Sequence, residues 1–552
     1  MTPGRASARE IIALVADDFV RLPHEERPSA PDGPLAWPGY DAARARAAER
    51  TGESESVVCG TATVGGVRAV LIAFEFGFLG GSLGERTGDL LVAAYTYARE
   101  HWLPVVPLVA TGGSRMQEGM LALTQLQRVA RQSALTREAG LPQVAVLRDP
   151  TTGGGWATLG AGADVVLALP GAQVGFAGSR VRPPDADPAA YTAEAQVAVG
   201  AADAVVPAAE LRDVLGLWLR LLTDGVPPTA RVCAPAPGPP TPADHRPDAP
   251  APSDASGART APAVAAPEDG SGAGGEGDSS AEGEGDSSAE GEGDSSAEGE
   301  GDSSAEGSSS RGGSGGGGSS GGGSSGGGSG AGGVVVGAPV PDALGEAGLP
   351  ATGWAAVQRA RSAGRPRAGA YLDAYFTRRL AISGDRCGGV DPDGMLCGFG
   401  VHQGRTVAYA AQTGAATRPA GYRTAVRLIR LAERLGIPVL TLVDTPGAAN
   451  DAEAERQGAG AAIAELFGVV AAARTPITTL VIGEGGSGGA LALAAPGRTW
   501  ATPDSYFSVI APESAAAILK RPPAEAEATA DQLRIRPQDL VELGVIRATN
   551  AR

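Results

Sequence analysis

The sequence predicts an α/β fold that is built twice, with a long low-complexity segment between the two copies. Three observations lead to this prediction. The chain has 552 residues, which is too long for a single hydrophobic core. Short apolar runs alternate with amphipathic helical runs in both halves. The middle of the chain contains almost no large apolar residue.

The low-complexity segment covers residues 234–333. It opens with a Pro- and Ala-rich stretch, continues with the unit "GDSSAEGE" starting at Gly277, Gly285 and Gly293, and ends in nearly pure Gly and Ser. It carries 17 acidic and 3 basic residues, so it accounts for −14 of the formal net charge of −17. Because this composition buries too little apolar surface to offset chain entropy, we expect a disordered acidic and Gly/Ser-rich linker.

Residues 35–230 are predicted to form the first domain, after an N-terminal extension of residues 1–34. The runs "VRAVLIAFEF", "LPVVPLVA" and "LPQVAVLRD" have the apolar content of buried strands. Between the last two, "QEGMLALTQLQRVARQSALTREA" has the apolar spacing of a helix. The stretch "ADVVLALPGAQVGFAG" adds further strand-like sequence.

Residues 350–552 are predicted to form the second domain with the same order of elements. Here "GYRTAVRLIRLAERLG" and "AGAAIAELFGVVAAAR" are predicted helices, and "IPVLTLVD" and "PITTLVIG" are predicted strands. In both halves a helix leads through an X-Pro pair into an apolar strand and a Gly-rich turn. This order indicates two copies of one α/β unit.

The Gly-rich turns after corresponding strands also correspond. "LVATGGSRM" in the first half matches "LVDTPGAAN" in the second, and "LRDPTTGGGWATLGAG" matches "IGEGGSGGALALAAPG". A glycine pair before a helix leaves backbone N–H groups unpaired, and without a Cβ a ligand can approach them closely. Such a turn can cradle a phosphate, stabilise an oxyanion, or simply allow close packing of strand and helix.

Several motif readings of these turns are weak. A P-loop needs a lysine after its last glycine, and none is present. "GEGGSGG" can be scored as a dinucleotide fingerprint, but the pattern fails in the other half. A serine elbow around Ser487 lacks any histidine after it. An oxyanion site needs only backbone amides, so it fits best at Gly112, Gly113, Gly488 and Gly489.

Longer motifs resemble a known family. "FEFGFLGGSLGERTGD", "TGGSRMQEGMLAL", "DPTTGGGWA" and "GFAGSRV" resemble the β subunit of bacterial acetyl-CoA carboxylase carboxyltransferase. "GYRTAVRLIRLAERLGIPVLTLVDTPGA", "VIGEGGSGGALALA" and "YFSVIAPESAAAILK" resemble its α subunit. The resemblance implies a β–α fusion with two crotonase-like (ββα spiral) domains.

The resemblance also implies a function. Biotin-dependent carboxyltransferases move a carboxyl group from N-carboxybiotin on a carrier protein to acetyl-CoA, giving malonyl-CoA for fatty acid or polyketide synthesis. The implied catalytic glycines are Gly112 and Gly113 for the acyl-CoA enolate, and Gly488 and Gly489 for biotin. The implied substrate-binding residues are Arg115, Gly153, Gly154, Arg180, Gly447, Gly485 and Gly486. For Arg115 a bracing salt bridge is the competing interpretation, and Glu484 and Glu513 are expected to fix loops and not to act as bases.

The implied partners are a biotin carboxyl carrier protein and a biotin carboxylase, because the chain has no Met-Lys-Met biotinylation site. A homodimer of fused chains is also expected. The β subunit's Cys₄ zinc ribbon is missing, the α-like loops "DTPGAANDAEAERQGAG" and "QTGAATRPAGY" differ from the family pattern, and the family's longer helical tail is missing. Two alternatives therefore stay open: a carboxyltransferase for propionyl-CoA or another acyl-CoA, and a catalytically inactive assembly subunit.

Composition narrows the remaining possibilities. The four cysteines and four histidines form no cluster with metal-ligand spacing, so no metal is expected. No basic block suggests nucleic acid, and no apolar run is long enough for a membrane span. A cytoplasmic location is the resulting expectation.

Overall fold

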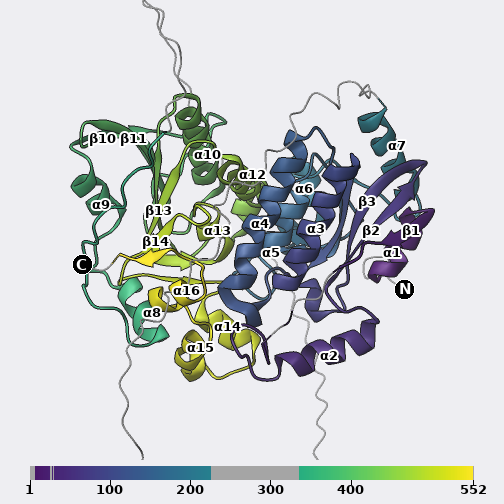
Figure 1. The fold of residues 1–552 in the computed structure, drawn as a ribbon, viewed down its shortest axis with the longest axis horizontal. Helices are drawn as coiled ribbons and strands as arrows, with labels where there is room; N and C mark the ends of the chain where they lie inside the picture. The colour runs from purple at the N-terminus through teal and green to yellow at the C-terminus, as the bar shows by residue number, and fades with distance from the viewer. Residues whose placement is uncertain (1–5, 25–27, 29, 225–334, 551–552) are drawn as a thin grey trace, which may run out of the picture. The chain divides into compact units, whose positions relative to one another are not determined.

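The computed structural model describes residues 6–24, 28, 30–224 and 335–550. The described residues belong to one compact unit, in which two α/β halves are distinguished by their sheets (Figure 1). The predicted linker, residues 234–333, lies outside the described residues, as do Cys233 and His245.

The described residues of the first half contain an eight-stranded sheet. Its order is β1-β2-β3-β4-β5-β6-β8, with β7 paired to β5 away from this path. The first three strands are antiparallel neighbours, and the pairs from β3 onward are parallel. The strands are β1 (Asp18–Arg21), β2 (Val57–Val64), β3 (Val67–Phe74), β4 (Val105–Thr111), β5 (Val144–Thr152), β6 (Val165–Ala168), β7 (Val174–Gly175) and β8 (Ala204–Val205).

Helices cover this sheet, and every residue of the central strand β4 is buried. Burial on both faces explains why the parallel strands are continuously apolar instead of alternating. The helical segments are α1 (Ala8–Val15), α2 (Tyr40–Thr51), η2 (Leu79–Gly81), α3 (Glu85–His101), η3 (Met116–Glu118), α4 (Gly119–Glu138), α5 (Gly153–Gly155), the π-helical η4 (Trp156–Gly160), η5 (Pro188–Tyr191), α6 (Ala193–Ala198) and α7 (Leu211–Thr223).

The second half repeats this plan among its described residues. Its sheet has the order β9-β10-β11-β12-β13-β14-β16, and β15 pairs with β13 as β7 pairs with β5. The antiparallel strands again come first and the parallel ones follow. The strands are β9 (Arg378–Ile382), β10 (Met395–His402), β11 (Arg405–Gln412), β12 (Val439–Thr445), β13 (Ile477–Gly486), β14 (Thr499–Ala501), β15 (Tyr506–Ser508) and β16 (Ala548–Thr549).

The helices of the second half begin where the sequence supplies start signals. Pro419 occupies the first turn of α10, where its missing N–H leaves no donor unpaired. The segments are α8 (Gly353–Arg361), α9 (Ala368–Tyr375), α10 (Pro419–Arg434), α11 (Ala452–Arg456), α12 (Ala459–Ala472), α13 (Ser487–Leu491), α14 (Pro512–Ile518), η6 (Pro523–Glu525), α15 (Ala526–Gln532) and α16 (Pro537–Glu542).

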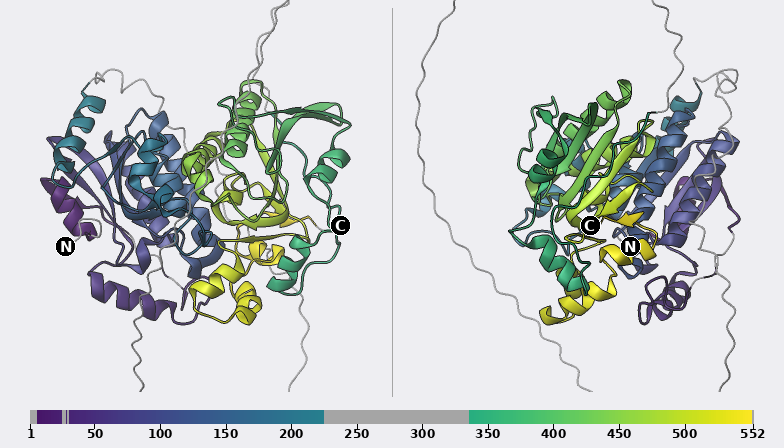
Figure 2. Two further views of the ribbon diagram at one scale, coloured as in Figure 1. Left: turned by 180° about the vertical axis from the view of Figure 1, so that it is seen from behind. Right: turned by 60° about the vertical axis from the view of Figure 1, so that its left-hand side comes forward.

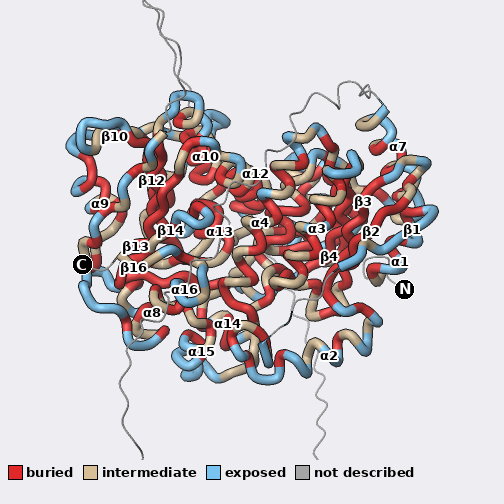
Figure 3. The backbone as a smooth tube through the Cα atoms, in the orientation of Figure 1, coloured by how far each residue is buried: buried red, intermediate tan, exposed pale blue. Residues whose placement is uncertain are grey.

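The matching strand orders confirm the internal repeat and the α/β class of both halves. Helices α4 and α12 pack against each other where the halves meet, and the view from behind agrees (Figure 1, Figure 2). One hydrophobic cluster contains Leu126 and Val129 of α4 together with Ile463 and Phe467 of α12. Figure 3 shows the buried backbone of α4 and of the neighbouring strands in red.

Candidate active site

Two Gly-rich turns lie side by side at the carboxyl ends of the parallel strands in each half. The register pairs Thr111 of β4 with Thr151 of β5, and Thr445 of β12 with Gly485 of β13. Counting onward from these pairs, Gly153–Gly155 are equivalent to Ser487–Gly489, and Gly113 is equivalent to Gly447. Ligands of parallel α/β sheets bind at these carboxyl ends.

The turn after β4 uses its own N–H groups. The N–H of Gly112 donates to the carbonyl of Gly80 at 2.9 Å, and that of Gly113 donates to Thr111 Oγ1 at 3.0 Å. Gly113 has φ of +103°, which favours glycine. Both amides of the predicted oxyanion pair, Gly112 and Gly113, therefore have acceptors within the chain.

In the turn after β5, by contrast, two backbone N–H groups have no recorded acceptor among the described residues. Gly153, with φ of +64°, donates its N–H to the carbonyl of Phe176 at 3.1 Å. Among the described residues no acceptor is recorded for the N–H of Gly154 or of Gly155. These two groups stand at the start of the α5–η4 helical segment, where N–H groups have no partner within the helix.

The second half repeats this arrangement at α13. Ser487 has φ of +53°, matching Gly153, and within the described part of the chain no acceptor is recorded for the N–H of Gly488 or Gly489. The carbonyl of Gly489 accepts from Tyr422 Oη at 3.1 Å and from Gln412 Nε2 at 3.2 Å. These bonds from α10 and β11 fix the carbonyl at the end of the Ser487–Gly489 turn.

The turns Gly153–Gly155 and Ser487–Gly489, called here the free-amide turns, both lie against two side chains of the first half. A Cβ built on Gly488 would lie 3.5 Å from Phe176 Cζ and 3.7 Å from Leu126 Cδ1. A Cβ on Gly154 would overlap the same Leu126 side chain. The structure therefore brings Gly153 and Gly154 together with Gly488 at a junction of the halves, and Leu126 and Phe176 line it.

The other predicted glycines support this junction through their small size. Gly447 donates its N–H to Thr445 Oγ1 at 3.2 Å and has φ of +145°. Gly485 and Gly486 pair with Phe507 and Ser508 of β15, and a Cβ on Gly486 would overlap the carbonyl of Pro446. Close packing of strand and turn accounts for Gly485 and Gly486, and the positive φ accounts for Gly447.

Arg115 is a bracing residue, and its predicted contact with substrate does not fit its burial. Its side chain is 1% exposed, and Nη2 contacts Glu55 Oε1 at 2.5 Å while Nη1 lies 3.4 Å from Glu118 Oε1. Burial alone would lower the pKa of this guanidinium, but the facing carboxylates raise it above its ordinary value. The arginine thus fixes the turn after β4 without offering surface to a ligand.

The remaining charged candidates are Arg180, Glu484 and Glu513. Arg180 is exposed on the segment that follows β7. Glu484 and Glu513 both contact Arg361, at 2.8 Å and 2.5 Å, and Tyr506 Oη donates to Glu484 at 2.8 Å. Their ion pairs agree with the expected loop-fixing role.

Sequence reasoning missed the residues that connect the halves. Gln127 of α4 donates to the carbonyl of Ala494 at 2.7 Å, and Tyr191 Oη donates to the carbonyl of Asn450 at 2.7 Å. Glu455 of α11 is buried, and its Oε1 accepts from the N–H of Phe176 at 2.6 Å. Burial raises the pKa of the Glu455 carboxyl to about 7, although the amides it accepts from oppose the shift. Only the departure of the α11 loop from the family pattern had drawn attention to this segment.

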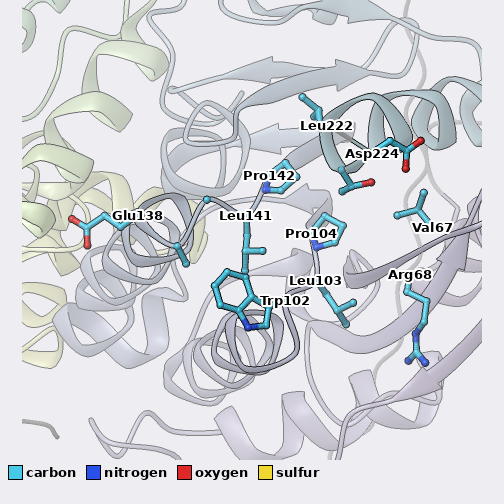
Figure 4. A pocket seen from close by; sticks show the side chains of 13 residues that line it. Val67, Arg68, Trp102, Leu103, Pro104, Glu138, Leu141, Pro142, Leu222 and Asp224 are labelled. Atoms are coloured by element: carbon cyan, nitrogen blue, oxygen red, sulfur yellow. The ribbon is translucent and has the colours of Figure 1, made fainter. Parts of the chain in front are cut away.

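A surface pocket of about 460 Å³ lies elsewhere in the first half (Figure 4). It is formed near the amino ends of β3 and β4, opposite the edge that carries the glycine turns. Its lining consists of Val67, Arg68, Trp102, Leu103, Pro104, Glu138, Ala139, Gly140, Leu141, Pro142, Leu222, Thr223 and Asp224. Because this pocket is at the opposite ends of the strands, it is separate from the glycine turns.

The described ranges contain neither a metal-binding cluster nor a helix suited to a membrane. No group of three or more His, Cys, Asp or Glu side chains could hold a metal ion there. Likewise, no helix in that part of the chain has the length and apolar character needed to cross a membrane.

Comparisons with known proteins match both halves. Residues 37–201 match the "Carboxyl transferase domain" family, and residues 349–549 match the "Acetyl co-enzyme A carboxylase carboxyltransferase-like" family. A solved structure of the β subunit of P. aeruginosa geranyl-CoA carboxylase is 18% identical, covers 97% of this chain and 80% of that chain, and has a TM-score of 0.31. A TM-score this low does not support a structural argument.

Curated relatives match along nearly the whole chain. The "Acetyl-coenzyme A carboxylase carboxyl transferase subunits beta/alpha" of Salinispora arenicola is 34% identical over 98% of this chain and 81% of the relative. The protein of the same name from Saccharopolyspora erythraea is 32% identical over 92% of this chain and 73% of the relative. Identity at this level over both halves shows that the chain belongs to the family of acetyl-coenzyme A carboxylase carboxyl transferases with joined beta and alpha subunits.

Proposed function

We propose that this chain is the carboxyltransferase component of an acetyl-CoA carboxylase. It transfers a carboxyl group from N-carboxybiotin on a separate carrier protein to acetyl-CoA and forms malonyl-CoA. The names of the relatives support this acyl substrate. The observation that carries the proposal is the meeting of two free-amide turns, one from each half, across Leu126 and Phe176.

The residues of the second turn fit a ureido group. An added Cβ at Gly488 would only touch Phe176 and Leu126, and the N–H groups of Gly488 and Gly489 have no recorded acceptor among the described residues. These two glycines would hold the ureido oxygen of biotin. When bound, carboxybiotin supplies the carboxyl group and a basic ureido atom.

The first turn would serve the acyl-CoA. In this proposal the N–H groups of Gly154 and Gly155 stabilise the enolate oxygen that develops from the thioester, and they replace Gly112 and Gly113 in this role. One preorganised amide donor is worth about 3 kcal/mol of the barrier. Leu126 is buried and Phe176 is half-buried beside these amides, and apolar surroundings would strengthen such hydrogen bonds.

The proposal extends to organisation and partners. We take residues 35–230 and 350–552 as the two carboxyltransferase domains and residues 234–333 as the linker. A biotin carboxyl carrier protein and a biotin carboxylase are the expected partners, and a homodimer is the expected assembly. Arg180 remains proposed as a contact for CoA, because it is exposed on the segment after β7.

The testing experiment is biotin-dependent decarboxylation of malonyl-CoA by the purified full chain, repeated with methylmalonyl-CoA. Turnover of malonyl-CoA is expected to be the faster of the two. Faster turnover of methylmalonyl-CoA would move the assignment to propionyl-CoA. No turnover of either compound would favour the inactive assembly subunit.

A further inference from the structure

Helix α11 of the second half carries one buried carboxylate, Glu455, that bonds to the first half. The side chain is 1% exposed. Its Oε1 accepts the N–H of Phe176 at 2.6 Å and the N–H of Ala177 at 3.2 Å. A Cβ on Gly175 would lie 3.2 Å from the same oxygen, so a glycine before Phe176 leaves room for this close approach.

The residue held by Glu455 touches both free-amide turns. The carbonyl of Phe176 accepts the N–H of Gly153, which is the residue immediately before the free amides of the first turn. The ring of Phe176 faces Gly488 of the second turn. A single peptide segment therefore connects Glu455 to the first turn through its backbone and to the second turn through its ring.

Few polar or charged groups lie around the carboxylate of Glu455. Its second oxygen, Oε2, is buried and has no hydrogen-bond partner among the described residues. The guanidinium of Arg182 lies over the ring of Tyr191, with 3.9 Å from its Cζ to the ring centroid, and attracts the carboxylate from the segment after β7. Gln196 of α6 faces the same carboxylate. Asp451, the N-cap of α11, and Arg456 at its end are further charges that act on Tyr191.

We infer that Glu455 is a positioning residue, through which docking of the second half fixes the Gly153–Gly155 turn of the first half in its oxyanion-binding conformation. The inference rests on the proposed function for the meaning of that turn. Two N–H groups on one carboxylate oxygen define the orientation of the Phe176 peptide, and that peptide defines the orientation of Gly153. Catalytic competence in the first half thus depends on a contact made by the second half.

The test compares Glu455→Ala and Glu455→Gln with the control Glu453→Gln in the full chain. Glu453 is on the same helix but exposed, and its carboxylate contacts only the side chain of Gln457 among the described residues. Loss of charge-assisted hydrogen bonds predicts a kcat about 10- to 100-fold lower for Glu455→Ala, with a smaller change in KM for acyl-CoA. Glu455→Gln keeps an acceptor, so it should recover part of this loss, while Glu453→Gln should match the parent chain.

Two further readouts separate positioning from simple loss of stability. The pH profile of kcat in the parent chain should contain an ionisation near neutrality that disappears in Glu455→Gln. Hydrogen exchange, measured without substrate or biotin, should be at least tenfold faster at Phe176, Ala177 and Gly153 in Glu455→Ala, and unchanged in Glu453→Gln.

Unchanged exchange at these three amides together with unchanged kcat would overturn the inference. If Glu455→Ala fails to fold, the pH profile and exchange of Glu455→Gln decide instead. A parent chain without carboxyl transfer would remove the proposed function, but the exchange experiment would still test whether Glu455 orders the turn.

Discussion

Replacing Gly488 with alanine separates the chemistry of the second turn from its folding. The backbone of Gly488 is outside the left-handed region, so an L-residue is not strained there. The added Cβ would lie 3.5 Å from Phe176 Cζ and 3.7 Å from Leu126 Cδ1, which are ordinary van der Waals contacts. Alanine therefore fits, but its methyl group occupies the space in front of the free amides.

Gly488→Ala is expected to change folding stability and turnover in opposite directions. A Gly→Ala change at a compatible position stabilises a protein by about 0.4–1 kcal/mol, because it reduces the entropy of the unfolded chain. Blocking one oxyanion donor costs about 3 kcal/mol of transition-state stabilisation, or about 10²- to 10³-fold in kcat. Gly488→Ala should therefore melt at the parent temperature or slightly above it while losing most of its turnover.

The neighbouring glycine provides a contrast. A Cβ on Gly489 would overlap the backbone nitrogen of Ala448 and lie 2.7 Å from Tyr422 Oη. Since the backbone there cannot move aside freely, Gly489→Ala should lose about 1–3 kcal/mol of folding stability by overpacking. Gly468→Ala in α12 is the matched control, because nothing lies within 4 Å of its added Cβ.

The assays are thermal melting and biotin-dependent decarboxylation of malonyl-CoA on the same preparations. A stable Gly488→Ala chain with turnover within about threefold of the control would refute the assignment of this turn to oxyanion stabilisation. A strongly destabilised Gly488→Ala chain would instead refute the packing described around Phe176 and Leu126.

Three further predictions concern the supporting residues. Arg115→Met leaves the carboxylates of Glu55 and Glu118 buried without their cation, so urea denaturation should show a loss of about 3–5 kcal/mol; a loss below 1 kcal/mol would contradict the bracing role. Burial raises the pKa of Glu455 from 4.5 to about 7, so between these values the folded state binds more protons than the unfolded state. Folding stability should therefore fall as pH rises through this window, by up to about 3 kcal/mol. Glu455→Gln should remove this pH dependence, and an identical dependence in both chains would contradict the assignment. Gly112→Ala should lower kcat less than tenfold, since its N–H is already bonded within the chain; a hundredfold loss would return the oxyanion role to this turn.

The internal repeat and the glycine turns could be predicted because each depends on a local sequence pattern. Buried parallel strands need continuous apolar runs, and the turns that follow them need glycine, so both signals appear in any one half of the sequence. The long family motifs around Gly112, Gly153 and Gly488 then indicated which turns are candidates for the function. The strand orders and the relatives confirm the fold class and the family.

The sequence did not show which of the neighbouring glycine turns has N–H groups without an acceptor. "TGG" after β4 and "TTGGG" after β5 have nearly the same composition, but the first donates its N–H groups to Gly80 and Thr111. Whether an amide is free depends on which carbonyl or hydroxyl the fold brings to it, and this information is absent from the spacing of glycines.

The sequence by itself determined that two α/β units are joined and that glycines dominate the turns after their parallel strands. Only the tertiary structure decided which amides are free and which residues hold them. Arg115 became a buried brace, and Glu455 became a contact between halves, because their partners lie 60 and 279 positions away along the chain. Local sequence patterns encode strands and turns, but they do not encode pairings at such separations.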